Sequence, residues 1–143
     1  MDWEYVCIFE DDALPCKEIV NKLEHYLNVL PEDADILKMG HLRYIDNPIK
    51  LSQDFIRVLT YGSHSYMVFK RYYQDYIDIA SNKDLHVDRL CMNNPTKNIY
   101  TTNECLFIQE DSMFKDTVLH KHLKDMKFME SEYVKNNFER WSF

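Results

Sequence analysis

A short apolar run near the start of the chain ends directly in three acidic residues, and this junction limits the folds that the chain can adopt. Tyr5-Val6-Cys7-Ile8-Phe9 has the length and composition of a buried strand, and Glu10, Asp11 and Asp12 follow it. Carboxylates at the carboxyl end of such a strand can hold a divalent cation beside a cleft. Their oxygen atoms suit Mg²⁺ or Mn²⁺, which often bridge to phosphates. The junction predicts a sheet with a candidate metal site at a strand end. The alternative is an acidic turn that is only solvated.

Strands alternate with helices along the rest of the chain, which predicts an α/β domain with a mixed sheet flanked by helices. The predicted strands are Trp3 to Phe9, Asp35 to Met39, Phe55 to Thr60, Ser65 to Phe69, Ile99 to Thr101 and Leu106 to Gln109. The predicted helices are Cys16 to Leu30, Lys70 to Ala80, Thr117 to Met129 and Glu132 to Trp141, with a short helix or turn over Leu85 to Met92. Ala13 to Pro15 is expected to turn the chain, and Gly40 to Gln53 to form a loop.

The two best-defined helices show apolar faces at helical spacing. In the first, the expected inward residues are Ile19, Val20, Leu23, Tyr26, Leu27 and Leu30, with Pro15 at its start. In the second, they are Tyr73, Tyr76, Ile77 and Ala80.

Composition narrows the function classes. The 143 residues suffice for one domain, and a net charge of −7 makes nucleic-acid binding an improbable main function. Two glycines are too few for a Gly-rich phosphate loop or a dinucleotide-binding fingerprint. No apolar run is long enough for a transmembrane segment. The four cysteines form no C-x-x-C pair, and we interpret them as buried thiols, with disulfides as the minor alternative. We therefore expect a cytoplasmic location, with peripheral attachment to the inner membrane as a variant.

Three blocks in order resemble glycosyltransferase family 25, the lipooligosaccharide-biosynthesis family that includes collagen galactosyltransferases. Residues 5–13 resemble its strand-plus-EDD motif, Gly62-Ser63-His64-Ser65-Tyr66 its Gly-Thr-His-Ala-Tyr-type strand, and His86-Val87-Asp88 its Pro-Ile-Asp element. A weaker fourth block, Leu106 to Gln109 with Ser112, resembles the closing segment of the family. The resemblance covers roughly residues 3 to 117.

This resemblance implies a GT-A-like fold, a UDP-hexose donor, Mn²⁺ or Mg²⁺, and transfer with inversion to a glycan acceptor. Family members carry several dozen further residues before the EDD strand, whereas only nine residues precede Glu10 here. We therefore expect residues 1–143 to form the C-terminal two-thirds of a family domain, with residues 118–143 as a helical tail. A catalytically incomplete half is the rival interpretation. Such a binding or scaffold piece would need a partner chain, or a homodimer, to complete its pocket.

The resemblance and the chemistry together assign candidate roles. Asp12 is expected to ligate the metal directly, while Glu10 and Asp11 bind the metal through water or contact the donor ribose. Glu10 and Asp12 alternate on an extended backbone and so can face one side.

A base must also accept the proton of the acceptor hydroxyl. Asp88 is the first candidate, with a helix cap or an ion pair to Arg89 as its alternative role, and Glu110 and Asp111 come next. Gly62 and His64, which lie in one turn, are candidates for donor binding, with an acceptor contact or a purely structural role as the alternatives for His64. His86 is a weaker candidate for a third metal ligand.

Overall fold

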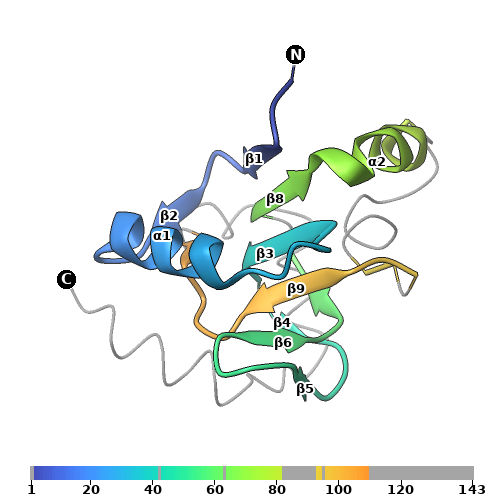
Figure 1. Ribbon diagram of the computed structural model, residues 1–143. Coiled ribbons are helices and arrows are strands. Elements are labelled where there is room, and N and C mark those ends of the chain that lie inside the picture. The colour runs from blue at the N-terminus through green and yellow to red at the C-terminus, as the bar shows by residue number, and fades with distance from the viewer. Residues whose placement is uncertain (1, 42, 63, 82–92, 95, 110–143) are drawn as a thin grey trace, which may run out of the picture.

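A six-stranded mixed sheet forms the centre of the structure, which is a computed structural model (Figure 1). Its strand order is β1 (Tyr5–Phe9), β8 (Ser65–Phe69), β3 (Ile36–Gly40), β9 (Ile99–Thr102), β6 (Phe55–Arg57) and β5 (Ile49–Lys50). Only β3 and β9 run parallel, and the other four neighbouring pairs are antiparallel. Two smaller sheets pair β2 (Ala13–Pro15) with β10 (Phe107–Gln109) and β4 (Arg43–Tyr44) with β7 (Thr60–Tyr61). The α/β class with a mixed sheet is confirmed.

The structure describes residues 2–41, 43–62, 64–81, 93–94 and 96–109. The predictions for residues 82–92 and 110–143 lie outside this part. They include the turn over Leu85 to Met92, the two C-terminal helices, the helical tail of residues 118–143, and the candidates His86, Asp88, Glu110 and Asp111.

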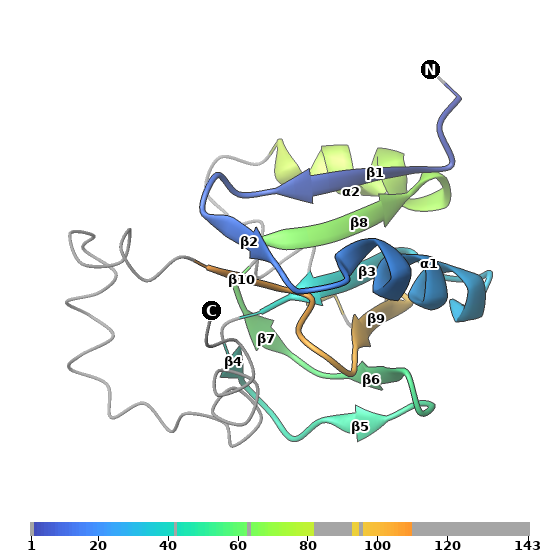
Figure 2. The same cartoon turned by 90° about the vertical axis from the view of Figure 1, so that its left-hand side faces the viewer.

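The central strand β3 is buried along its whole length, which explains its largely apolar sequence, in which Lys38 is the one charged residue. Alternate residues of a strand point to opposite faces, so the two faces of the sheet have separate cores. One face packs Leu37 and Met39 with the inward side of α1 (Ile19–Val29). The other packs Ile36 with Tyr72 of a 3₁₀ turn (Lys70–Tyr72) and with α2 (Tyr73–Ala80). The two helices thus cover opposite faces (Figure 2).

Several local predictions were wrong at the edges of the sheet. β1 is an edge strand whose residues are exposed or half-buried, not the buried strand that its apolar run predicts. Pro15 belongs to β2, whose partner β10 is distant in sequence, so the helix begins later, at Ile19. Within the predicted loop of residues 40–53 lie the short strands β4 and β5, and the predicted strand of residues 55–60 is divided between β6 and β7.

The predicted inward faces of the helices need smaller corrections. Val20 is 74% exposed and Ile77 is 55% exposed, because each lies at the margin of its apolar stripe. Ala80 is also exposed, and Tyr72, just before α2, is fully buried in its place.

The cysteine prediction holds in part. Cys7, Cys16 and Cys105 are free thiols, as expected. Cys16 is buried and Cys105 is half-buried, but Cys7 is exposed on the edge strand β1. Cys91 lies outside the described residues. Among the described residues, no helix is long and apolar enough to span a membrane.

Gly40, at the end of β3, has no room for a side chain. A Cβ atom there would lie 2.5 Å from Cδ2 of His64 and 2.8 Å from the carbonyl oxygen of Phe107. The absence of a side chain at residue 40 therefore allows the His64 imidazole to pack between β3 and β10.

We predict that Gly40→Ala lowers the free energy of unfolding by roughly 1–3 kcal/mol, because the methyl group displaces the His64 ring. The measurement is urea denaturation of the variant alone and combined with His64→Ala. The cost of Gly40→Ala should fall by about 1 kcal/mol in the His64→Ala background. An equal cost in both backgrounds would show that His64 is not the obstacle.

Candidate functional site

The acidic residues lie in the turn that connects β1 to β2. The amide of Ala13 donates to the carbonyl oxygen of Glu10 at 3.1 Å and closes this turn. Glu10 and Asp11 are exposed, and Asp12 is half-buried. The turn brings the side chains of Glu10 and Asp12 toward the same group on a different strand. Residues 10–12 do not continue the extended backbone of β1, so the alternation expected from the sequence is not the cause.

That group is the side-chain amide of Gln109, at the end of β10. Its Nε2 donates to Oε2 of Glu10 at 2.7 Å and lies 3.4 and 3.3 Å from the two carboxylate oxygens of Asp12. Its Oε1 is buried and has no hydrogen-bond partner among the described residues. Two carboxylates and one amide therefore converge from the ends of two strands, across 97 and 99 positions in sequence.

His64 holds these two strand ends together through its main chain and its ring. Its carbonyl oxygen accepts from the amide of Glu10 at 3.0 Å, and its Nε2 lies 2.9 Å from the carbonyl oxygen of Phe107. A carbonyl oxygen can only accept, so Nε2 carries the proton. The imidazole is fully buried, which favours the structural role over direct contact with a donor or acceptor.

The backbone conformation at residue 62 favours glycine there. The φ of Gly62 is 88°, in the region that disfavours residues with a Cβ atom. This conformation lies in the connection from β7 to β8 that leads to His64. The role of Gly62 in donor binding stays a prediction.

The donor set of the acidic turn suits a hard cation. After rotation of its amide, Oε1 of Gln109 and the carboxylates of Glu10 and Asp12 would offer three oxygen ligands. Mg²⁺ in proteins commonly uses one or two carboxylates and completes its shell with water and substrate phosphates. No group of three or more His, Cys, Asp or Glu side chains in the described residues is arranged around a metal position. A cation here would therefore depend on Gln109 and on ligands from outside this group.

The sequence did not identify the role of Gln109, although its segment belongs to the fourth block of the resemblance. The available signal was its position directly after the apolar residues of a predicted strand, like that of Glu10 after Tyr5 to Phe9. The remaining candidates, Asp88, His86, Glu110 and Asp111, lie outside the described residues.

A second group of buried polar side chains surrounds Lys38, on the face of the sheet that α2 covers. Its ammonium group donates to the carbonyl oxygen of Val58 at 3.0 Å, to Oγ1 of Thr60 at 3.1 Å and to Oδ1 of Asn93 at 3.2 Å. All three acceptors are uncharged, so burial lowers the pKa of Lys38 to about 7, although Asp46 acts in the opposite direction. Burial, together with Lys38 and His64, also lowers the pKa of His41 to about 3, so this imidazole is neutral.

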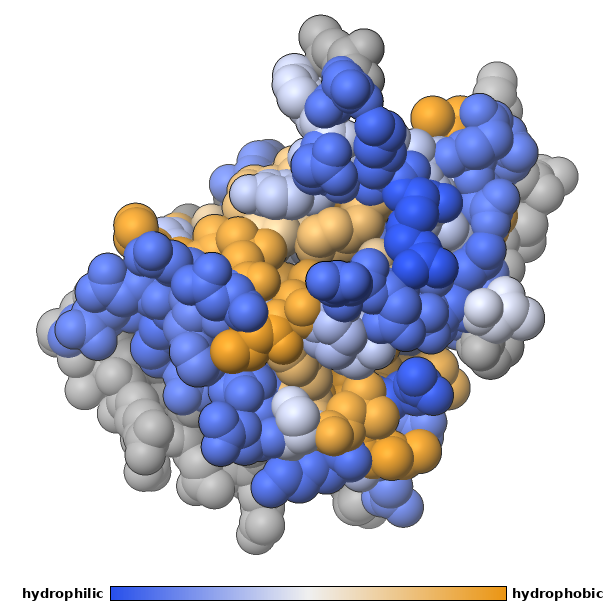
Figure 3. All heavy atoms as spheres, viewed as in Figure 1, coloured by the Kyte–Doolittle hydropathy of each residue, from blue (hydrophilic) through white to orange (hydrophobic). Residues whose placement is uncertain are grey.

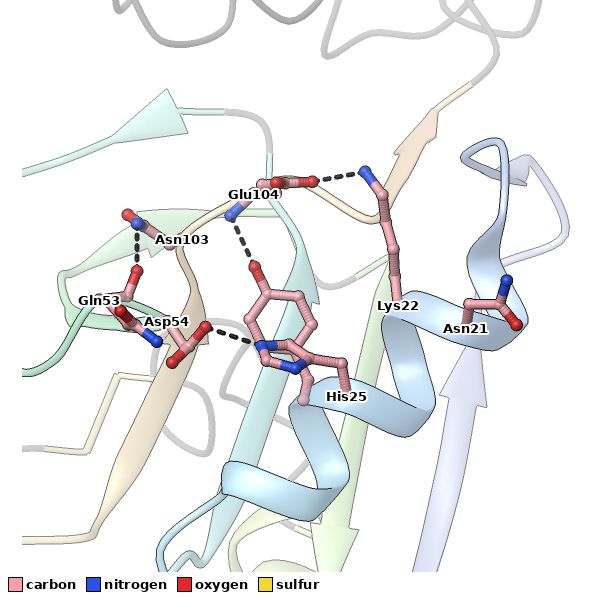
Figure 4. A pocket seen from close by; sticks show the side chains of 8 residues that line it. Asn21, Lys22, His25, Gln53, Asp54, Asn103 and Glu104 are labelled. Atoms are coloured by element: carbon pink, nitrogen blue, oxygen red, sulfur yellow. Dashed lines mark hydrogen bonds and ion pairs between the residues drawn. The ribbon is translucent and has the colours of Figure 1, made fainter.

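A polar pocket of about 270 Å³ lies on the other side of the sheet, between α1 and the ends of neighbouring strands (Figure 4). Lys22 and His25 of α1 point across it toward Glu104 and Asp54, at 2.5 and 2.9 Å. Asn103 closes another wall by donating to the carbonyl oxygen of Gln53 at 2.7 Å. None of the predicted site residues lines this pocket, so it is separate from the acidic turn.

Comparisons with known proteins do not place the chain in a family. No protein-family model matches it, and no curated protein matches its sequence. The class that fold and site define is therefore an α/β domain with a convergent acidic turn.

We predict a pH-dependent difference in stability between the wild type and Lys38→Met. The pKa of Lys38 is about 7 in the folded state and near its ordinary value of 10.5 in the unfolded chain. The unfolded state therefore binds more protons between these values, and the wild type gains stability as pH rises through this window. The Met variant lacks this titration.

Urea denaturation of both proteins from pH 7 to pH 10 checks this. The free energy of unfolding of the wild type, relative to that of the variant, should rise with pH with a slope approaching about 1.4 kcal/mol per pH unit. A constant difference across the window would mean that Lys38 remains charged in the folded state.

Proposed function

We propose that this chain is a metal-dependent glycosyltransferase domain of the family 25 type with a GT-A-like, incomplete fold. It would transfer a hexose, galactose in the first instance, from UDP to a lipooligosaccharide or related surface glycan, with inversion. The observation that supports this most strongly is the convergence of Glu10 and Asp12 on Gln109. All three residues belong to segments that carry the family resemblance, and a mixed α/β sheet is compatible with it. The reaction would take place on the cytoplasmic side of the membrane.

Each residue has a definite task in this proposal. Asp12, Glu10 and Gln109 would hold Mn²⁺ or Mg²⁺, with Asp11 near the donor ribose. The ion would neutralise charge on the diphosphate as the sugar leaves. His64 would act as a positioning residue, since it fixes the backbone of Glu10 and the strand that carries Gln109. Asp88 would accept the proton of the acceptor hydroxyl.

The second candidate function is a binding or scaffold piece that needs a partner chain to complete its pocket. The observation in its favour is the small number of ligands at the acidic turn, two carboxylates and one amide. In this case the chain alone would not hold a nucleotide.

Calorimetric titration of UDP in the presence of Mn²⁺ separates the two candidates. If the chain is a self-sufficient transferase domain, UDP binds, and omission of Mn²⁺ weakens binding. Asp12→Asn should weaken the Mn²⁺-dependent binding at least tenfold, a roughly estimated lower bound for loss of a metal ligand. Glu24→Gln, an exposed carboxylate on α1, is the matched control and should bind like the wild type.

Absence of binding at millimolar UDP would contradict self-sufficiency and favour the partner-dependent piece. Binding that Asp12→Asn leaves unchanged would refute the ligand assignment itself.

A further inference from the structure

β1 is a sheet edge whose outer backbone groups can be identified from its pairing with β8. The amide of Lys70 donates to the carbonyl oxygen of Glu4 at 2.9 Å. The amide of Glu10 donates to the carbonyl oxygen of His64 at 3.0 Å. Backbone groups alternate in direction along a strand, so Val6 and Ile8 also face β8. The N–H and C=O groups of Tyr5, Cys7 and Phe9 therefore point away from the sheet, where no described strand pairs with them.

The side chains of the same three residues form an exposed apolar row. Tyr5 is 40% exposed, Phe9 is 48% exposed, and Cys7 is exposed as well. The Tyr5 ring packs against Phe69, with 5.8 Å between ring centroids, and the Phe9 ring packs against Phe107, with 5.0 Å between centroids. Figure 3 shows apolar surface on this face, beside the hydrophilic N-terminal residues.

Within the part of the chain that the structure describes, this edge lacks the usual protection against strand addition. Natural edges are blocked by Lys, Pro, bulges or a covering element, and Tyr5 to Phe9 contains no Lys, no Pro and no bulge in its register with β8. An open apolar edge of this kind is a template for one further strand.

Charge at both ends of β1 decides which strand fits. Asp2 and Glu4 precede it, and Glu10, Asp11 and Asp12 follow it. Lys70 pairs with Asp2, whereas the side-chain amide of Gln109, which contacts Glu10 and Asp12, carries no charge. Both ends of the edge are therefore acidic.

A second copy of this chain is a poor partner for the edge. A closed two-fold dimer would pair β1 with itself in antiparallel orientation. Centred on Cys7, this pairing places Glu4 opposite Glu10 and Asp2 opposite Asp12, and like charges directly opposite are destabilising. Moving one strand by two residues places Glu10 opposite Val6 and Glu4 opposite Asp12, or Glu4 opposite Ile8 and Asp2 opposite Glu10.

We propose that the β1 edge binds an extended strand of another polypeptide, with alternating apolar residues at its centre and Lys or Arg at both ends. The backbone groups of Tyr5, Cys7 and Phe9 supply the hydrogen bonds, and the flanking carboxylates select the basic ends. This inference does not depend on the transferase activity.

Amide hydrogen exchange by NMR tests it, with the synthetic peptide Lys-Lys-Val-Thr-Val-Thr-Val-Lys-Lys at millimolar concentration. Without peptide, the amides of Tyr5, Cys7 and Phe9 should exchange faster than those of Val6 and Ile8. With peptide, the first three should slow by about tenfold or more, and added salt should reduce the effect. A peptide with Glu in place of every Lys should have no effect.

Two variants make the result specific. Cys7→Pro removes one outward N–H and should abolish the slowing, whereas Cys7→Val keeps the N–H and should preserve it. Glu4→Lys changes only the charge at one end and should weaken binding of the basic peptide, even if the Pro variant fails to fold.

Three results would overturn the proposal. They are unchanged exchange at Tyr5, Cys7 and Phe9 with the basic peptide, equal binding of the acidic peptide, or a concentration-dependent dimer of the chain alone that protects these amides.

Discussion

The candidate site depends on one buried side chain, His64. Its main-chain oxygen holds the amide of Glu10, and its ring donates to the carbonyl of Phe107, two residues before Gln109. Gly40 leaves the space that the ring needs. Three strands thus meet at one imidazole, and the acidic turn and the Gln109 amide face one another because their backbones are fixed at this point. A buried hydrogen bond of this kind contributes little net free energy to folding. A substitution that removes the His64 ring and leaves the Phe107 carbonyl without a donor would nevertheless cost about 1–3 kcal/mol of stability.

The position of this junction at the margin of the sheet has two consequences. The carboxylates of Glu10 and Asp12 lie in a turn that solvent reaches, where water and phosphate oxygens can complete the coordination of a cation. The strand that leads into the turn also keeps one row of backbone groups open, with acidic residues at both ends. The same residues that suit a cation therefore also favour a basic partner strand over a second copy of the chain.

The sequence predicts the interior better than the margins. β8 and β3 are largely apolar, with Ser65 and Lys38 as their polar residues, and they form strands where expected because both faces of each are covered. β1 has the same local pattern, but whether a neighbour lies beside it is not a local property, so its exposure could not be predicted. The pairing of β2 with β10 overrides the turn tendency of Pro15 for the same reason.

The candidate site shows the same limit. The proximity of Glu10 to Asp12 arises from the turn that the Ala13 amide closes, whereas their contact with Gln109 arises from strand pairing over nearly a hundred positions. The sequence made His64 a candidate, but its burial, which favours a positioning task, depends on how β3 and β10 pack around it. The buried amine of Lys38 gave no sequence signal, since it lies within an apolar strand.

The central claim is that Glu10, Asp12 and Gln109 form one cation site, and the side-chain amide of Gln109 reports on it directly. NMR of this NH₂ group during a titration with Mg²⁺ is the most direct measurement. The claim predicts a saturable shift of the Gln109 signals, as the amide turns its oxygen to the ion, and loss of this shift in Asp12→Asn. Signals that do not respond to Mg²⁺, or that respond equally in the variant, would contradict it.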